Sequence, residues 1–329
     1  MTTRRGLLSA GVAWPVLAWA RLAYAQAKPL VLIGWLNSGS YDSQGHLLVA
    51  FKEGLAVLGW KEGANVIFEK RWADGRIDRL SALAGELMAR RPVVIVAFPL
   101  VAAAAATKVA PNTPIVYIGG DPVAAGLVAS LARPGGMVTG VTTLSTAISE
   151  KYLELLLAAA PKLRRIGFLI DTGTTATNHA LNMASARRAV AQHSVEARYA
   201  EVARPEEIEP ALSRLAKEGA QALVVMPGSF VGTERRRVVK LALTHRWPVV
   251  ATASEFAEEG ALLSYGVNSS ANYRRAAYYV DRILKGAKPG ELPIEQPTKF
   301  DLVINRKTAK SLGLTIPQSL LISADKVIE

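Results

Sequence analysis

The 329-residue chain contains no cysteine. Disulfide bonds, thiol catalysis and thiolate metal sites are therefore excluded, and the stability of the fold has to come from packing. The apolar run near the N-terminus is also not followed by a cysteine, so we expect no bacterial lipid anchor.

Motifs for common catalytic and cofactor chemistries are missing as well. The four histidines, His46, His179, His193 and His245, are not spaced as a metal pair on one helix face, and no Gly-x-Ser-x-Gly nucleophile motif occurs. The glycines of Gly135–Gly140 are predicted to end a helix and precede a strand, whereas a dinucleotide fingerprint follows a strand and opens a helix. We therefore expect no catalytic residue, no metal and no cofactor.

Long apolar runs are absent except at the N-terminus. There the basic pair Arg4-Arg5 precedes a 15-residue, mostly apolar run, Gly6–Ala20, which is too short to cross a hydrocarbon core of about 30 Å. The small residues of Ala23–Ala25 then form a signal-peptidase site. We predict a signal peptide over residues 1–25, Gln26 as the first mature residue, and a periplasmic location. The paired arginines fit a twin-arginine signal, and an ordinary Sec signal is the alternative.

Negative charge is scarce relative to positive charge, because 39 Lys and Arg stand against 27 Asp and Glu, a net charge of +12. Removal of residues 1–25 would leave 36 basic and 27 acidic residues, a net charge of +9. These charges are spread along the chain, unlike those of a nucleic-acid reader, so we expect no nucleic-acid partner. The clusters Arg164-Arg165 and Arg235-Arg236-Arg237 are interpreted as solvated basic surface. A mild preference for acidic ligands is the alternative.

Short apolar runs alternate with stretches of helical spacing along the chain. The runs predict buried strands at Leu30–Leu36, Val66–Glu69, Val93–Ala97, Ile115–Ile118, Arg165–Ile170, Ala222–Met226, Val249–Ala251 and Ala261–Tyr265. The stretches predict helices at Ser43–Leu58, Ile77–Ala89, Val101–Val109, Ser149–Ala159, Asn178–Gln192, Pro205–Glu218, Thr233–His245 and Tyr273–Lys285. This alternation is typical of parallel sheets with helices on both faces. We therefore predict an α/β fold, with a break near Thr142–Thr146 that separates two Rossmann-like lobes.

An internal repeat supports the two lobes. A proline, an acid seven residues later and a glycine five residues after that occur twice, at Pro114/Asp121/Gly126 and at Pro248/Glu255/Gly260. Chance similarity is the alternative, because few positions match. Ligands of open parallel sheets bind at the carboxyl ends of the strands. The repeat therefore predicts that Asp121 and Glu255 face each other across a cleft.

Five loops at predicted strand ends carry small polar residues. Such residues before a helix offer N–H groups to an anion or a polar ligand. For any single loop, capping of the helix is the alternative. Together the five loops predict a polar-lined ligand cleft. They are Asn37–Tyr41, Gly119–Asp121, Asp171–Thr174, Gly228–Ser229 and Thr252–Glu255.

Several stretches of the sequence are characteristic in combination. They are Pro114–Val116, Gly119–Val123, Gly126–Gly136, Val138–Gly140, Gly260–Gly266, Ile283–Pro289, Gln296–Asn305 and Lys307–Pro317. Over essentially the whole chain after residue 25, they resemble a family of ABC-transporter substrate-binding proteins. That family includes tryptophan- and tyrosine-type solute-binding proteins.

The resemblance implies a type I periplasmic-binding-protein fold. Two Rossmann-like lobes, joined by a hinge that the chain crosses three times, then capture a small solute between them. The N-terminal lobe would comprise residues 28–143 plus about 268–297, and the C-terminal lobe residues 144–267 plus about 298–329. The resemblance also implies that the protein is not an enzyme and that its partners are a small-molecule solute and a membrane ABC permease. We expect a monomer.

The loop after the third predicted strand departs from the family. Small polar residues and a Thr-Pro pair are usual there, whereas this chain has Phe98-Pro99-Leu100-Val101. The more apolar wall favours a ligand with an apolar or aromatic portion, stacked on Phe98 or Tyr41. The alternative is that Phe98 packs beneath the loop.

In the predicted binding mode, the ligand docks on the N-terminal lobe and is enclosed when the C-terminal lobe closes. For an amino acid, Asp121 or Glu255 would pair with the ammonium group, and helix N-termini would hold the carboxylate. The predicted hinge lies near Thr142–Thr143, Tyr265–Asn268 and Thr298–Phe300. The predicted ligand-binding residues are Ser38, Tyr41, Phe98, Pro99, Gly120, Asp121, Asp171, Thr172, Ser229, Ser254, Glu255 and Tyr265.

Two other classes of protein stay open at this point. An enzyme on a two-lobed Rossmann-like scaffold, such as a glycosyltransferase or a racemase, would share the architecture, because a fold does not fix a function. The export signal, the lack of cysteine and the unpaired histidines argue against it. An exported ligand-binding sensor component is the other class, and the neighbouring genes would separate it from a transport protein.

Overall fold

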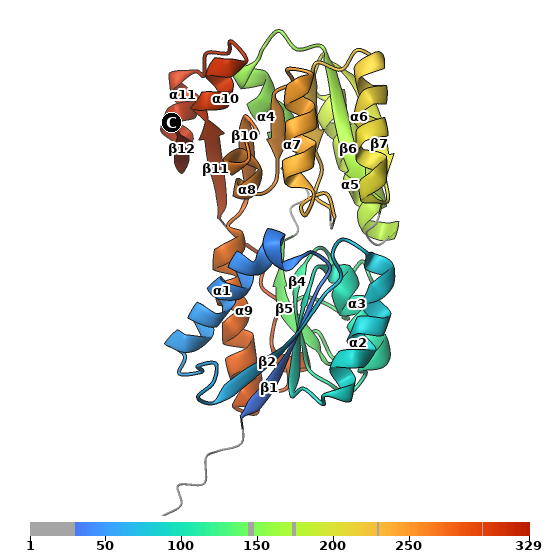
Figure 1. Cartoon of the computed structure of the whole chain (residues 1–329), viewed down its shortest axis with the longest axis vertical. Helices are drawn as coiled ribbons and strands as arrows, with labels where there is room; N and C mark the ends of the chain where they lie inside the picture. Colours follow the sequence, from blue (N-terminus) through green and yellow to red (C-terminus); the bar gives the residue numbers. More distant parts are fainter. Residues whose placement is uncertain (1–29, 144–147, 173–175, 229, 298) are drawn as a thin grey trace, which may run out of the picture.

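The computed structural model describes residues 30–143, 148–172, 176–228, 230–297 and 299–329. The predicted signal peptide and the predicted site residue Ser229 lie outside these residues. Within them, no helix combines the length and the apolar character that crossing a membrane requires. The chain forms two lobes, one above the other in Figure 1, each built on its own sheet.

The N-terminal lobe has a five-stranded, all-parallel sheet of order β2-β1-β3-β4-β5. Its strands are β1 (Val31–Asn37), β2 (Val66–Trp72), β3 (Val94–Phe98), β4 (Ile115–Gly119) and β5 (Val138–Thr142). Helices α1 (Tyr41–Val57) and α9 (Ser269–Leu284) pack together on one face, and α2 (Leu80–Ala89) and α3 (Leu100–Val109) on the other. Successive side chains of a strand point to opposite faces of the sheet, so alternate residues pack into the hydrophobic cores on the two faces.

The C-terminal lobe has a seven-stranded sheet of order β12-β11-β10-β9-β8-β6-β7. Its strands are β6 (Arg165–Asp171), β7 (Glu196–Val202), β8 (Ala222–Val225), β9 (Val249–Ala251), β10 (Leu263–Val267), β11 (Phe300–Asn305) and β12 (Lys326–Ile328). Its helices are α4 (Ile148–Ala159), α5 (Ala176–Ala191), α6 (Ile208–Lys217), α7 (Arg235–Thr244), α8 (Ser254–Glu258), α10 (Arg306–Ser311) and α11 (Gln318–Ser323). Short 3-10 turns lie at Ile77–Arg79, Pro205–Glu207 and Pro289–Glu291. One core cluster covers each face of this sheet.

The predicted fold class is confirmed, with two corrections in detail. The pairing of β10 with β11 is antiparallel, so the second sheet is not wholly parallel. The predicted helix before Gly135 is wrong, because residues 121–134 form turns. Pro122 and Pro134 punctuate this segment, and Gly126 and Gly135 take φ angles of +70° and +79° that a helix cannot accommodate.

The repeated proline–acid–glycine pattern falls on corresponding parts of the two lobes. Strand β4 lies between β3 and β5, and β9 lies between β8 and β10, in the same relative order. Asp121 follows β4, and Glu255 lies in α8 after β9. The pattern therefore marks one structural unit that occurs in both lobes.

The chain passes between the lobes three times (Figure 1). It leaves the first lobe after β5, returns from β10 into α9, and leaves again before β11. Asn268 marks the second passage, where its Oδ1 accepts a hydrogen bond from Ala271 N at 2.9 Å and caps α9. Its Nδ2 donates to Asp301 Oδ2 at 2.9 Å, which ties the start of α9 to β11.

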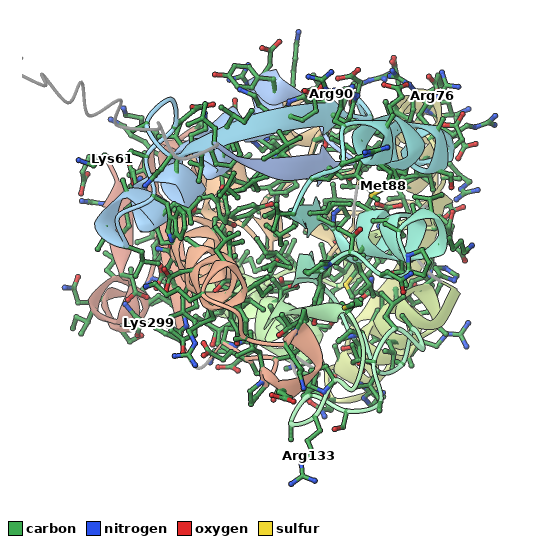
Figure 2. All side chains as sticks on the ribbon, turned by 90° about the horizontal axis from the view of Figure 1, so that it is seen from below. Lys61, Arg76, Met88, Arg90, Arg133 and Lys299 are labelled. Carbon is green, nitrogen blue, oxygen red and sulfur yellow. The ribbon has the colours of Figure 1, made fainter. Side chains whose placement is uncertain are left out.

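Positive charge lies at separate places on the molecule. Seen from below, Lys61, Arg76, Arg90, Arg133 and Lys299 extend outward at well-separated points of the outline (Figure 2). In this view the basic residues form no single continuous face, which agrees with the spread of charge along the sequence.

Candidate functional site

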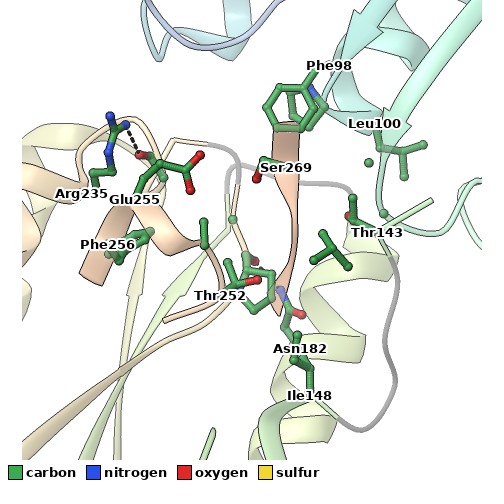
Figure 3. A pocket seen from close by; sticks show the side chains of 18 of the residues that line it. Phe98, Leu100, Thr143, Ile148, Asn182, Arg235, Thr252, Glu255, Phe256 and Ser269 are labelled. Atoms are coloured by element: carbon green, nitrogen blue, oxygen red, sulfur yellow. Dashed lines mark hydrogen bonds between the residues drawn. The ribbon is translucent and has the colours of Figure 1, made fainter. Parts of the chain in front are cut away.

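A cavity of about 250 Å³ lies between the two lobes. It sits at the carboxyl ends of the central strands of both sheets, where open α/β sheets bind their ligands. Figure 3 shows Phe98 and Glu255 entering it from different lobes, with Thr252, Asn182 and Ile148 on a further side. The lining residues are those of 43–44, 46–47, 98–100, 119–120, 143, 148–149, 181–182, 185, 188, 227–228, 232, 235, 252–253, 255–256, 267 and 269.

The N-terminal lobe contributes the aromatic side chain of Phe98 to the cavity wall. Phe98, at the end of β3, lines the cavity, and its ring lies 5.6 Å from the ring of Tyr273 in α9. Tyr273 in turn lies 5.8 Å from Trp35. Phe98 therefore presents one face to the cavity while buried aromatic side chains fix it from behind, so the alternative of a ring hidden beneath its loop is not what the structure has.

Glu255 is the acidic group of the cavity. Its Oε1 lies 3.0 Å from His46 Nε2 of the opposite lobe, and its Oε2 accepts a hydrogen bond from Ser254 Oγ at 3.2 Å. Burial by itself raises the pKa of Glu255, but the His46 hydrogen bond, its own backbone N–H and the charges of His46 and Arg235 outweigh this, so the pKa lies below its ordinary value. Glu255 therefore stays ionised within a largely enclosed site.

Arg235 is a cationic group of the cavity that the sequence interpretation placed in solvent. That interpretation is wrong for Arg235, whose side chain is only 10% exposed. It is confirmed for Arg236, whose side chain is 76% exposed. The reason is helical geometry, since Arg235 shares the buried face of α7 with Val238, Val239 and Ala242. Its Nη1 donates to Gly232 O at 3.2 Å, while its buried Nε has no hydrogen-bond partner.

Neutral polar groups complete the lining. The sequence prediction named none of them as a binding residue, although Thr252 lies in a loop that it predicted to line the cleft. They are Ser43, Gln44, Thr143, Ser149, Asn182, Ser185, Thr252 and Ser269. Asn182 Nδ2 donates to Pro227 O at 2.8 Å, which ties α5 to the loop after β8. The buried Oε1 of Gln44 has no partner. Most of these residues lie inside helices, so a search for loops at strand ends could not find them.

Four of the predicted binding residues line the cavity. They are Phe98, Pro99, Gly120 and Glu255. All four lie at the carboxyl end of a central strand or within four residues after it, on β3, β4 and β9, which is where the strand-end argument placed them.

Asp121 does not belong to the cavity lining, which corrects the expectation of two facing acids. Its Oδ1 accepts hydrogen bonds from the backbone N–H groups of Val123 at 2.9 Å and Ala124 at 3.0 Å. A short aspartate side chain at the start of a turn reaches its own backbone first. Asp121 thus caps the turn that replaces the expected helix.

Asp171 and Thr172 also lie away from the cavity lining, at the end of β6. The fully buried Asp171 accepts a hydrogen bond from Phe230 N at 2.9 Å, so it braces the loop after β8. Thr172 donates twice to Val202 O of the neighbouring strand, from N at 2.8 Å and from Oγ1 at 3.2 Å. Both residues shape the loops around the site rather than its surface.

The remaining predicted residues are neighbours of the cavity rather than its lining. Ser38 is buried at the end of β1 and its Oγ has no partner, while Tyr41 is 60% exposed and packs edge-on against Trp72. Ser254 reaches the site through its bond to Glu255. Tyr265 of β10 stacks on Phe300 of β11 at 5.7 Å, and these are the two strands that adjoin the second and third passages.

No metal centre is formed by the part of the chain that the structure describes, since no group of three or more His, Asp or Glu side chains there could hold an ion. The chemistry of the cavity is that of recognition. It combines the aromatic ring of Phe98, one carboxylate, guanidinium groups and several neutral hydrogen-bonding groups.

Comparison with known proteins assigns the family. The model of the ABC transporter substrate-binding protein family matches residues 40–328. The chain belongs to this family. The resemblance inferred from the sequence motifs is thereby confirmed.

Proteins similar to this substrate-binding protein cover most of its length. The tyrosine-binding protein of Clostridioides difficile (strain R20291) is 25% identical over 265 residues, which cover 80% of this chain and 75% of that protein. A domain from Streptococcus pneumoniae, solved in complex with L-Trp, is 25% identical with a TM-score of 0.83, over 91% of this chain and 100% of that one. A conserved domain protein from Vibrio cholerae is 26% identical with a TM-score of 0.84, over 90% and 99%.

Proposed function

We propose that this substrate-binding protein captures an aromatic amino acid between its lobes and delivers it to an ABC permease. The observation that carries the proposal is the composition of the cavity. The aromatic ring of Phe98 from one lobe faces a carboxylate and a buried guanidinium from the other. A zwitterion with an aromatic side chain complements all three features at once.

Each charged group has a natural partner in such a ligand. The ionised Glu255 would pair with the ammonium group. The Nε of Arg235, which makes no hydrogen bond and lies 4.0 Å from Glu259 Oε1, would donate to the carboxylate. The ring would stack on Phe98, an arrangement worth about 0.5–1.5 kcal/mol beyond the area that it buries. The cavity of about 250 Å³ lies just below the range of about 300–1,000 Å³ that is typical of pockets for drug-sized ligands, which fits a smaller solute such as an amino acid.

Two relatives support this ligand class. The relative from Clostridioides difficile is a tyrosine-binding protein, and the domain from Streptococcus pneumoniae was solved with L-Trp. Capture without turnover agrees with a lining that offers recognition groups and with the family of the chain. We therefore propose that the protein is a binding protein and not an enzyme.

Capture would involve closure of the two lobes. We propose that residues 28–143 plus about 268–297, and residues 144–267 plus about 298–329, move as two bodies. The three passages near Thr142–Thr143, Tyr265–Asn268 and Thr298–Phe300 would serve as the hinge. The closed form would present both lobes to the permease. We further propose that the protein acts as a monomer in the periplasm after cleavage behind Ala25, which mass spectrometry of the exported protein can test by finding Gln26 at its N-terminus.

Isothermal titration calorimetry tests the ligand class. Residues 26–329 are titrated with L-tyrosine, L-tryptophan and L-phenylalanine, and with two matched analogues of the last, 3-phenylpropionate without the ammonium group and phenethylamine without the carboxylate. We expect at least one amino acid to bind and both analogues to bind more than tenfold weaker, because each leaves one buried charge unpaired.

A pair of glutamate variants in the same short helix sharpens this test. Glu255→Gln should lower the affinity for the amino acid more than tenfold. Glu258→Gln alters a surface ion pair with Lys326 and should leave the affinity unchanged. The proposal is wrong if none of the three amino acids binds, or if 3-phenylpropionate binds as tightly as L-phenylalanine. Chemical conversion of a bound amino acid would also contradict it.

A further inference from the structure

One hydrogen bond joins the two lobes beside the cavity. His46 Nε2, on α1 of the N-terminal lobe, lies 3.0 Å from Glu255 Oε1, on α8 of the C-terminal lobe. Both residues line the cavity. The His46 side chain is 43% exposed and that of Glu255 16%, so the bond spans the edge of the cavity from solvent inward.

The lobe opposite His46 holds Glu255 in a fixed position. Ser254 Oγ donates to the second carboxylate oxygen at 3.2 Å, and the charge of Arg235 acts on the carboxylate from α7. Glu255 therefore arrives at the interface with its orientation already set. A bond from a held carboxylate to a side chain of the other lobe restricts the movement of one lobe against the other.

Opposite charges flank this bond across the cleft. The charge of Asp42 in α1 acts on Arg236 in α7, and the charge of Glu206 acts on Arg76. Pro205, next to Glu206, lies close to Gly75, next to Arg76. The two lobes thus meet with complementary charge along one side, from α1 to the turn after β2.

We propose that His46 is a latch between the lobes, a positioning residue whose hydrogen bond to Glu255 holds the closed arrangement. The latch rests on the two-lobed capture proposed above, but not on the identity of the ligand. A hydrogen bond to a charged group of this kind shifts an equilibrium by about tenfold or more. Loss of the His46 bond should therefore shift the protein toward the open arrangement even without ligand.

Double electron–electron resonance on ligand-free protein tests the latch. Because the chain has no cysteine, Glu86→Cys in α2 and Arg214→Cys in α6 give two unique spin-label sites. Both side chains are more than half exposed, at 56% and 55%. The two helices lie on the side of the molecule away from the passage between α9 and β11 (Figure 1), so opening lengthens the distance between the labels.

The doubly labelled protein carries His46, His46→Leu or His46→Gln. With His46 we expect a population at short distance, which corresponds to the closed arrangement. The ratio of closed to open protein should be about tenfold lower with His46→Leu. His46→Gln should restore most of this ratio, because its side-chain amide reaches as far as Nε2 of histidine. In a Glu255→Ala background, His46→Leu should change the closed-to-open ratio less than twofold, because the carboxylate that His46 binds is already absent.

The latch is overturned if His46→Leu keeps the distance distribution of the parent, or if the parent shows no short-distance population. An equal effect of His46→Leu with and without Glu255 would also overturn it, since the residue would then act through another contact. Calorimetry can show no binding of aromatic amino acids while the latch is observed, and binding can be observed while the latch is absent. The two proposals can therefore be contradicted independently.

Discussion

The carboxylates of Asp121 and Glu255 follow corresponding strands of the two sheets, and their surroundings give them different tasks. Asp121 finds two backbone N–H groups within its own turn and binds those. Glu255 finds His46 of the other lobe and Ser254, and it lines the cavity. The position of an acid after a strand therefore brings it to the correct edge of the sheet, while the next few residues decide where its oxygens point.

Removal of the Asp121 cap should affect stability and leave binding intact. Asp121→Ala should lower the free energy of unfolding by about 1 kcal/mol, the typical cost of losing a side-chain cap, as measured by urea denaturation. Asp121→Asn keeps the Oδ1 acceptor and should restore most of this loss. Calorimetry should give both variants the affinity of the parent for its amino acid, and a weaker affinity would place Asp121 in the ligand site after all.

Phe98 offers a second prediction at the residue scale. Phe98→Leu keeps an apolar side chain but removes the ring, and should weaken binding of an aromatic amino acid up to about tenfold, the value of an aromatic pair. Phe68→Leu is the matched control, because Phe68 packs on Phe51, and it does not belong to the cavity lining. Equal affinities of the two leucine variants would show that the ligand does not stack on Phe98.

Helix α7 begins with three arginines, at the end where the helix dipole disfavours positive charge. Three positive charges at the N-terminus of a helix lower its stability, so other contacts of these arginines have to compensate for them. Arg235 lines the cavity, and Arg236 contacts Glu259 at 2.8 Å on the surface. Helix α7 therefore contributes Arg235 to the cavity, while Arg236 lies on its solvent-exposed face.

The two neighbouring arginines of α7 allow a paired test. Arg235→Met should weaken binding of the amino acid more than tenfold, because its carboxylate loses its charged donor, and it should lower the free energy of unfolding, because the buried Glu255 loses a neighbouring positive charge. Arg236→Met should change neither affinity nor stability by more than about 0.5 kcal/mol. An unchanged affinity of Arg235→Met, measured by calorimetry, would show that the carboxylate is bound elsewhere.

At the scale of the elements, apolar patterning determined most of the fold. The buried central strands are β-branched runs and were predicted close to their observed bounds. Strand β7 was not predicted, because it lies at the sheet edge and its sequence Glu196–Val202 alternates polar and apolar residues, a pattern that a search for continuous apolar runs does not detect. Strands β5, β11 and β12 were also absent from the list of predicted strands.

At the scale of the whole molecule, the buried interlobe carboxylate links stability to pH. Glu255 is faced by His46 from α1, Arg235 from α7 and the buried Tyr273 from α9. Its pKa in the folded protein lies below the ordinary value of 4.5, so its contribution to stability is present above that value and is lost as pH falls through the folded pKa.

The free energy of unfolding of the parent should therefore fall as pH decreases below about 4.5, with part of the decrease due to Glu255. Chemical denaturation from pH 7 to pH 3 measures it. In Glu255→Gln the acid-induced decrease should be smaller, since this group no longer binds a proton on unfolding. Identical pH dependence in both proteins would show that Glu255 has the same pKa folded and unfolded.

The sequence by itself determined the fold class, the two lobes, the family and the edge of the sheets at which the site lies. These follow from patterns that are local along the chain, namely apolar periodicity, strand-end position and characteristic motifs. For the same reason the sequence named Phe98, Pro99, Gly120 and Glu255, which lie at or shortly after the ends of central strands and line the cavity.

Only the tertiary structure decided which side chains meet. Arg235 joins the cavity because one face of α7 is buried, and His46 meets Glu255 although 209 positions separate them in the chain. Contacts between lobes depend on how two separately folded sheets are placed against each other, and no local pattern encodes that placement. The cavity, its charge arrangement and the interlobe bond are therefore properties of the assembled molecule.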